Sequence, residues 1–217
     1  MHIVSIQVGK PTSHQHTTYE DGNPVEWVSG IYKLPVSDRV CVGRTNLEGD
    51  GQADLKNHGG PDKAVHMYPV EHYAFWRAER GLTHMADGTY GENITTSGMD
   101  ENTVCLGDEY AIGECVLQIS QPRVPCWKPA RKFGMADLAR QVLATGRTGW
   151  YLRVLREGHI QAGDPIKLRA RPQPLWTINA CNNVMHPMRA NLDATRGLAS
   201  IPELAESWRH SLMRHLA

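Results

Sequence analysis

The stretch Tyr110-Ala-Ile-Gly-Glu-Cys-Val-Leu-Gln-Ile-Ser-Gln-Pro-Arg-Val-Pro-Cys-Trp-Lys128 contains the strongest fold signal in this 217-residue chain. Its first part predicts a β-hairpin, because two runs of strand-forming residues flank a turn at Gly113. The second strand, residues 115–120, leads directly into a segment where Cys126 lies among three prolines. Cys126 therefore lies in a stiff loop that follows the second strand of the hairpin.

Short strand-like runs recur on both sides of this hairpin, up to about Arg171. Gly, Pro, Asn and Asp separate these runs, which favours short strands joined by tight turns. A second turn at Glu157-Gly158 is expected to join strands over 151–155 and 159–162. Closely spaced, locally paired strands are typical of a β-barrel or a sandwich. The predicted strands cover 3–8, 30–33, 39–43, 64–68, 93–96, 108–112 and 115–120.

Helices are predicted at two places among the strands and again at the C-terminus. Residues 70–80 and 135–145 are each followed by a glycine that suits a left-handed C-cap. After Arg171-Pro-Gln-Pro174, strand alternation gives way to helical patches at 175–184 and 201–216. We therefore expect a mainly β domain with peripheral helices over 1–171, and a small C-terminal helical extension over 172–217.

The last helical patch carries an apolar stripe at spacings of three and four residues. About 45 residues are too few to shelter such a stripe alone, so it should dock on the β domain or on a second subunit. The residues of the stripe are Ile201, Leu204, Ala205, Trp208, Leu212 and Leu216.

Composition excludes several classes of protein. With 41% hydrophobic and 21% charged residues, the chain is neither disordered nor collagen-like nor a coiled coil. Its 23 basic residues balance its 23 acidic ones, so no overall charge attracts nucleic acid or an anionic membrane. No apolar run approaches the ~18 residues of a membrane span, and the five cysteines contain no CxxC pair. A cytoplasmic protein without nucleic-acid or membrane partners is expected.

The segment around Cys126 is the first candidate site. Residues 123–132 contain four cations and no carboxylate, which would stabilise a thiolate and attract an anionic ligand. The alternative is a buried, inert cysteine with basic residues on an unrelated solvated face. These residues alone do not decide between the two interpretations. The cations are Arg123, Lys128, Arg131 and Lys132.

Two further loops could bind a ligand. The segment His58-Gly-Gly-Pro-Asp-Lys63 offers backbone N–H groups, a cation and a carboxylate, which suits a phosphate or a polar heterocycle. It matches no P-loop, and a plain surface turn remains open. The segment Tyr90-Gly-Glu-Asn-Ile94 could be a ligand-facing loop or a bulge.

Other catalytic arrangements find little support. His58, His66 and His72 are the most closely spaced histidine trio, but no HExxH motif accompanies them, so a zinc site is disfavoured. No G-x-S-x-G elbow is present, which argues against a serine hydrolase of that type.

Four segments in this order resemble the MOSC domain, named for the C-terminal region of molybdenum cofactor sulfurases, and within that superfamily the YiiM-like proteins. The mitochondrial amidoxime-reducing component is another relative. The resemblance implies a MOSC-type β-barrel that binds a molybdopterin-type cofactor, with a C-terminal helical extension. The segments are GRTNLEGDGQADLKNHGGPDKAVHMYPVEHYAFW (43–76), YGENITTSGM (90–99), CLGDEYAIGECVLQISQPRVPCWK (105–128) and GWYLRV (149–154).

Carried over residue by residue, the resemblance puts the family's cofactor-ligating cysteine at Cys126. Its His-Gly-Gly-Pro-Asp loop falls on 58–62 and its Gly-Glu-Asn motif on 91–93, with Tyr90 where Phe is usual. Cys126, as metal ligand, and Asp62 are the expected catalytic residues. The expected cofactor-binding residues are His58, Gly59, Gly60, Lys63, Glu92, Asn93, Arg123 and Lys128.

The resemblance implies a molybdenum-cofactor-dependent reductase of N-hydroxylated compounds, such as 6-N-hydroxylaminopurine. A separate reductase should supply electrons, because the chain has neither a GxGxxG fingerprint nor cysteines grouped for an iron–sulfur cluster. The alternative is a non-enzymatic module that carries the cofactor or cysteine-bound sulfur. YiiM-like relatives also suggest a homodimer.

Overall fold

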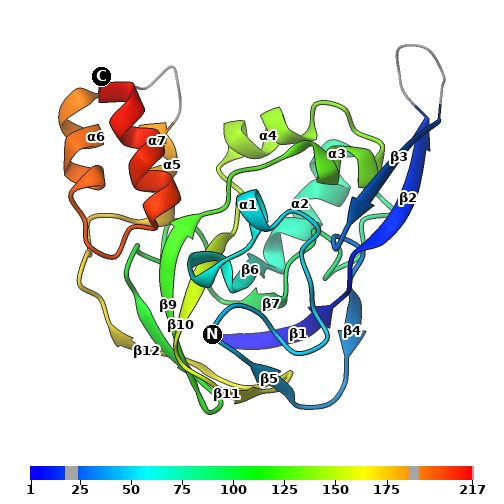
Figure 1. The fold of residues 1–217 in the computed structure, drawn as a ribbon, viewed down its shortest axis with the longest axis horizontal. Coiled ribbons are helices and arrows are strands. Elements are labelled where there is room, and N and C mark those ends of the chain that lie inside the picture. Colours follow the sequence, from blue (N-terminus) through cyan, green and yellow to red (C-terminus); the bar gives the residue numbers. More distant parts are fainter. Residues whose placement is uncertain (18–23, 186–190, 217) are drawn as a thin grey trace.

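The computed structural model describes residues 1–17, 24–185 and 191–216 (Figure 1). The strands are β1 (His2–Val8), β2 (Thr12–Thr17), β3 (Pro24–Ser29), β4 (Leu34–Val36), β5 (Val40–Val42), β6 (Val65–Pro69), β7 (Ile94–Ser97), β8 (Glu109–Ile112), β9 (Cys115–Pro122), β10 (Trp150–Arg156), β11 (Gly158–Ile160) and β12 (Ile166–Ala170). The helices are α1 (Leu55–His58), the 3-10 turn η1 (Pro61–Lys63), α2 (Glu71–Arg80), α3 (Trp127–Phe133), α4 (Leu138–Thr145), α5 (Ile178–Met185), α6 (Leu192–Ala199) and α7 (Glu206–Leu216).

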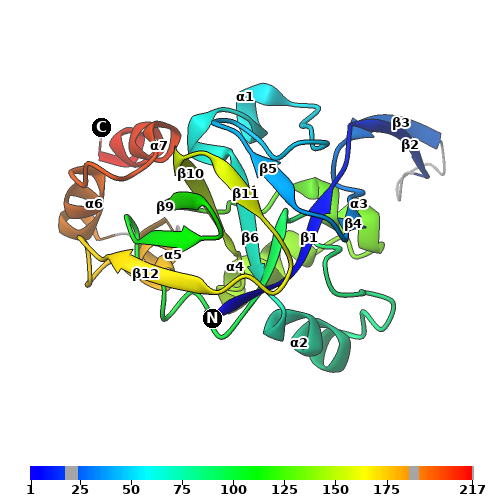
Figure 2. The same ribbon diagram turned by 90° about the horizontal axis from the view of Figure 1, so that it is seen from below.

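A large mixed sheet forms the body of the protein, in the order β12-β8-β9-β10-β6-β7-β1-β4. Its pairs are antiparallel except β6 with β7, which run parallel. Register shifts within β1–β7 and β9–β10 mark bulges, which bend and twist strands. Figure 2 shows the resulting curvature, with the start of β1 close to the chain entering β12.

The expected mainly β fold with helical additions is confirmed, but the sheet is not a closed barrel. Strands β12 and β4 stay at its edges. Backbone hydrogen bonds join β1 to the segment that enters β12: Ile3 N donates to Asp164 O at 3.0 Å, Gly163 N to Ile3 O at 2.9 Å and Ile166 N to Met1 O at 3.1 Å. The curved sheet still encloses the main apolar core, which includes Met67, Ile119 and Trp150.

Most elements predicted from sequence are present, including the hairpin at Gly113, but two strand predictions are wrong. Residues 30–33 are not a strand, since Gly30 crosses so close to Gly51 that a Cβ would strike its carbonyl oxygen. Strand β11 begins at Gly158, inside the expected turn, and it pairs with β5 instead of β10. Both errors arise from contacts between segments far apart in sequence.

Several elements were not predicted. They are β2 and β3, which form a projecting hairpin, and β4, β12, α1, η1, α3 and α6. The start of α6 does carry a local signal, because the Asn191 side chain accepts hydrogen bonds from the N–H groups of Asp193 and Ala194. Helix α4 begins at Leu138, three residues after the predicted start.

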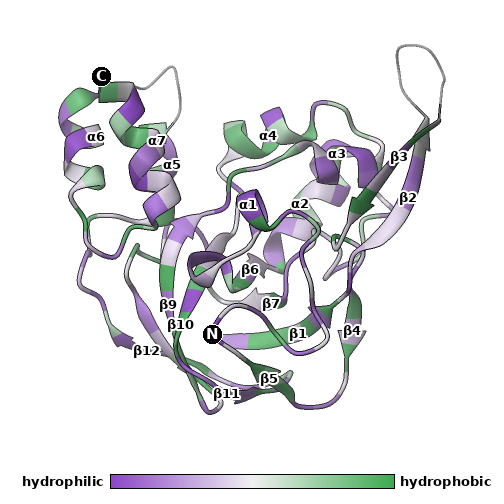
Figure 3. Ribbon diagram, in the orientation of Figure 1, coloured by the Kyte–Doolittle hydropathy of each residue, from purple (hydrophilic) through white to green (hydrophobic). Residues whose placement is uncertain are grey.

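Helices α5, α6 and α7 form a group beside the sheet, as Figure 1 shows. Apolar and polar residues alternate along α6 and α7 (Figure 3). Leu198, Trp208 and Leu212 are buried, whereas Leu192 and Met213 are exposed. The stripe that includes Leu204, Trp208 and Leu212 is covered by residues of the same chain, among them Leu106 and Leu198. The expected homodimer stays a prediction. In the described part of the chain, no helix is long and apolar enough to cross a membrane.

Replacing Trp150 should destabilise the sheet strongly. The side chain is fully buried in β10, between β6 and β9. Trp150→Ala should lower the free energy of unfolding by about 3–5 kcal/mol, measured by urea denaturation. Leu168→Ala, at a 43% exposed position of edge strand β12, should cost less than about 1 kcal/mol. Equal effects of the two changes would contradict this account of the core.

Candidate functional site

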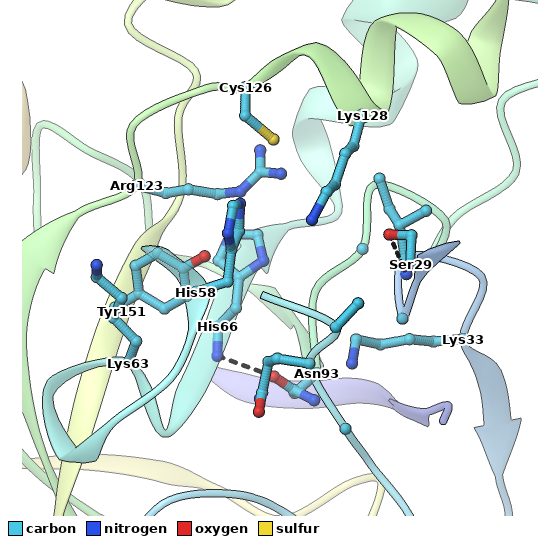
Figure 4. Close-up of a pocket in the computed structure, with 16 residues that line it drawn as sticks. Ser29, Lys33, His58, Lys63, His66, Asn93, Arg123, Cys126, Lys128 and Tyr151 are labelled. Carbon is cyan, nitrogen blue, oxygen red and sulfur yellow. Dashed lines mark hydrogen bonds between the residues drawn. The ribbon is translucent and has the colours of Figure 1, made fainter. Parts of the chain in front are cut away.

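Cys126 lies where two cavities adjoin. Figure 4 shows its thiol, the Arg123 guanidinium and the Lys128 amine converging on the first, which we call the inner cleft. The inner cleft is small, about 70 Å³. Its lining residues are Ser29, Gly30, Ile31, Lys33, Gly51, Gln52, Ala53, His58, Lys63, His66, Gly91, Asn93, Arg123, Cys126, Lys128 and Tyr151.

The backbone places Cys126 at the junction of a strand and a helix. Strand β9 ends at Pro122, and Cys126 is the N-cap residue of α3 with an extended backbone. Pro129 lies in the first turn of α3, where its missing N–H removes no helical hydrogen bond. The thiol is half-buried and makes no capping hydrogen bond, so it is available to a ligand.

Arg123 is a buried cation without a carboxylate partner among the described residues. Only 6% of the residue is exposed, and its guanidinium carbon lies 4.4 Å from the centre of the Tyr90 ring. Its Nη1 is buried and has no hydrogen-bond partner. A buried charge without a counter-charge lowers the stability of the folded protein, and an anion bound in the inner cleft would reduce this penalty.

Two histidines in the inner cleft are neutral at pH 7. Burial, reinforced by the charges of Lys128 and Arg123, lowers the pKa of His58 from 6.5 to about 4. Burial also holds the pKa of His66 well below its ordinary value, and its Nε2 has no partner. The positive charge of the cleft therefore comes from its arginine and lysines.

A hydrogen-bonded frame around Asp50 supports the opposite wall. The Asp50 carboxylate pairs with Lys33 and accepts hydrogen bonds from Gly9 N at 2.9 Å and Asn93 Nδ2 at 2.8 Å. The amide oxygen of Asn93 in turn accepts from His66 N at 3.1 Å. Asn93 thus has both ends of its amide engaged and ties β6 to the 47–54 loop.

The structure brings most of the predicted site residues together. Cys126, His58, Lys63, Arg123 and Lys128 line the inner cleft, as does Asn93. The cleft also contains residues that the sequence analysis did not assign to it, namely Lys33, His66 and Tyr151. No local pattern marks them, because each comes from a different strand or loop.

Glu92 and Asp62 do not line the inner cleft, contrary to expectation. Glu92 is fully buried, and its carboxylate accepts hydrogen bonds from the hydroxyls of Tyr73 and Thr95. The Asp62 carboxylate pairs with Arg153 at 2.8 Å, and Asp62 lines neither of the cavities that Cys126 lines.

The two loop glycines also differ from expectation. Gly59 and Gly60 do not line the cleft, and Gly60 has a φ of 95°, a conformation that favours glycine. His72 pairs with Glu101 at 2.7 Å, and no group of three metal-ligating side chains occurs in residues 1–17, 24–185 and 191–216. The three histidines are therefore not grouped as zinc ligands in the described residues.

A second cavity of about 420 Å³, which we call the outer chamber, adjoins the inner cleft and is also lined by Cys126. It shares His58, Lys63, Cys126, Lys128 and Tyr151 with the inner cleft. Its remaining lining residues are Asp54, Asn57, Gln121, Val124, Pro125, Trp127, Met185, Ser207, Trp208 and Ser211.

Comparisons with known proteins agree over both parts of the chain. Residues 54–167 match the MOSC domain family, and residues 176–217 match the YiiM-like, 3-alpha helix domain. The Bacillus subtilis protein YflK is 42% identical over 213 residues, which cover 98% of this chain and 93% of YflK. The crystal structure of YiiM from Geobacillus stearothermophilus is 39% identical, with a TM-score of 0.82 over 100% of this chain and 99% of that one.

A Gibberella moniliformis protein named "Reductase" is also similar. It is 37% identical over 180 residues, which cover 82% of this chain but only 32% of that protein.

The low pKa of His58 should make stability depend on pH. Because its pKa is about 4 in the folded protein and 6.5 ordinarily, the unfolded chain binds more protons between these values. The contribution of His58 to the free energy of unfolding is therefore complete above pH 6.5 and is lost as the pH falls toward 4. His58→Gln should show a smaller loss between pH 7 and 4.5 in urea denaturation. An NMR titration midpoint near 6.5 for His58 would contradict its burial among cations.

Proposed function

Because the chain belongs to the MOSC domain family, in its YiiM-like branch, we propose that it is a molybdenum-cofactor-dependent reductase of N-hydroxylated compounds. The family is associated with the molybdenum cofactor, and the similar protein named "Reductase" supports a reductive activity. Hydroxylaminopurines are the substrates we propose.

The observation that carries this proposal is a cleft that contains a half-buried thiol and a buried guanidinium whose Nη1 has no hydrogen-bond partner, but no acidic residue. A molybdopterin-type cofactor is anionic, and a soft thiolate suits its metal. The residues present fit such a group: Cys126 would ligate the metal, while Arg123, Lys63 and Lys128 would neutralise the anion. The unpartnered Nη1 of Arg123 would then gain an acceptor.

When bound, the cofactor would supply the two-electron redox chemistry that the deoxygenation needs. The overall reaction breaks the N–O bond of R–NHOH and, with two electrons and two protons, gives R–NH2 and water. A separate electron-donating reductase supplies the electrons. The chain itself holds the cofactor, orients the substrate and keeps the cleft cationic through residues that stay charged while His58 stays neutral.

The alternative, a carrier of cofactor or of sulfur on Cys126, needs the same thiol and the same cations. Metal analysis of protein from a molybdate-replete host separates the two: stoichiometric molybdenum with turnover supports the reductase, whereas a persulfide without molybdenum supports the carrier. We place this activity in the cytoplasm, where the five free cysteines stay reduced.

Cys126→Ser should abolish the activity without unfolding the protein. A hydroxyl is a harder and far less acidic ligand than a thiol, so bound molybdenum and hydroxylaminopurine reduction should both fall. Loss of an outer-shell partner alone typically costs about 10–100-fold in metal affinity, and loss of the ligand should cost at least as much. Molybdenum content and single-turnover rates measure the effect.

Cys41→Ser is the matched control, because Cys41 is also partly exposed but lies in β5, outside both cavities. It should keep both molybdenum and activity. Full turnover by the Cys126 variant would overturn the proposed function.

A further inference from the structure

The outer chamber differs in chemistry from the inner cleft. Its unshared lining is dominated by aromatic, apolar and neutral polar side chains, with Asp54 as its one carboxylate among the described residues. Its volume of about 420 Å³ lies in the range of small-molecule sites, roughly 300–1,000 Å³. Because Cys126 lines both cavities, a molecule in the outer chamber lies beside the proposed metal ligand.

One wall of the outer chamber comes from the C-terminal helices. Met185 ends α5, while Ser207, Trp208 and Ser211 belong to α7. These residues lie about 60–85 positions beyond Cys126 in the sequence. The chamber therefore exists only because the helical group docks beside β9.

Three hydrogen bonds fix the start of α7, two against the segment that leads to Cys126 and one against the 58–63 loop. Ala205 N donates to Ser120 O at 2.9 Å, and Ser207 Oγ donates to Gln121 Oε1 at 3.1 Å. Glu206 N donates to Asp62 Oδ2 at 3.4 Å. This wall is thus held in register with both the 58–63 loop and the cysteine segment.

The side chains of two tryptophans border the chamber. Trp208 is 97% buried, yet its indole Nε1 has no hydrogen-bond partner. Trp127 is half-exposed and is held by an edge contact with Trp27, at 5.2 Å between ring centres. Indoles provide flat apolar surface, and a buried indole N–H normally has an acceptor. A flat ring of a ligand would pack against the indole surface, and a ring nitrogen would accept a hydrogen bond from the indole N–H.

We propose that the outer chamber is the substrate site and that Trp208 makes it selective for flat N-hydroxylated heteroaromatic amines. The ring would lie against indole surface, and a ring nitrogen would accept from Trp208 Nε1. This orientation places the exocyclic N–O group toward Cys126. The inference rests on the proposed function for the reaction, but the binding of a flat heterocycle is tested separately.

The first test measures binding without turnover. Adenine, the product expected from 6-N-hydroxylaminopurine, is titrated into the full-length protein by calorimetry. The wild type should bind adenine, and Trp208→Phe, which keeps an aromatic ring but removes the donor, should bind about 10-fold more weakly. Trp176→Phe is the matched control, because Trp176 packs on the same helical cluster but does not line the chamber. Its affinity for adenine should equal that of the wild type.

A second variant covers the case in which Trp208→Phe fails to fold. Ser207 is exposed on the chamber wall, so Ser207→Phe should fill the chamber from a position outside the apolar core. It should abolish adenine binding while leaving the molybdenum content unchanged. Adenine binding that survives Ser207→Phe, or that is absent in the wild type, would overturn the inference.

Turnover by the molybdenum-loaded protein provides the second test. Trp208→Phe should raise KM for 6-N-hydroxylaminopurine about 10-fold and leave KM for hydroxylamine, which has no ring, unchanged. Equal changes for both substrates would overturn the assignment of Trp208. If no variant reduces either substrate while adenine binding still depends on Trp208, the proposed reductase function is wrong. The outer chamber is then still a binding site for flat heterocycles.

Discussion

The guanidinium of Arg123 is buried beside Cys126 without a counter-ion from the described chain, and the surrounding structure must support it. Its backbone N–H donates to Gly149 O at 3.1 Å, and Gly149 N donates to the Glu101 carboxylate at 2.7 Å. A side chain at Gly149 would strike the Met67 carbonyl, and its φ of 66° also favours glycine. The sheet thus holds a buried positive charge in place for an anion, at a cost in folding stability, as preorganised sites require.

Asp62 illustrates how a motif residue can serve the site without lining the inner cleft. Its carboxylate binds Arg153 of β10 and the first N–H of α7, and its carbonyl accepts from the Ser120 hydroxyl. One short turn therefore joins the sheet, the 58–63 loop and the C-terminal helices. Asp62 is a positioning residue in this arrangement, which gives a physical reason for an acidic residue beside a cationic cleft.

Local signals in the sequence were sufficient for the hairpin at Gly113, for helix 70–80 and for the cation-rich segment around Cys126. They were sufficient because each depends on residues within a few positions of one another. They could not reveal that β11 pairs with β5, or that Lys33 and Tyr151 line the same cleft as Cys126, because these arrangements join distant segments. The apolar stripe of the last helix correctly indicated a buried face. It carried no information on Trp208 as a chamber wall, because that role depends on where the helix docks.

The two cavities share Cys126 and four other residues, but only the outer chamber takes part of its wall from the C-terminal helices. In the proposed arrangement, the residues that hold the cofactor come from the sheet and its loops, and several that meet the substrate come from α5 and α7. Evolution can therefore alter the two sets at different rates. Substitutions along one face of the terminal helices would change the range of compounds accepted. The residues that hold the cofactor, and with them the reductive chemistry, would stay the same.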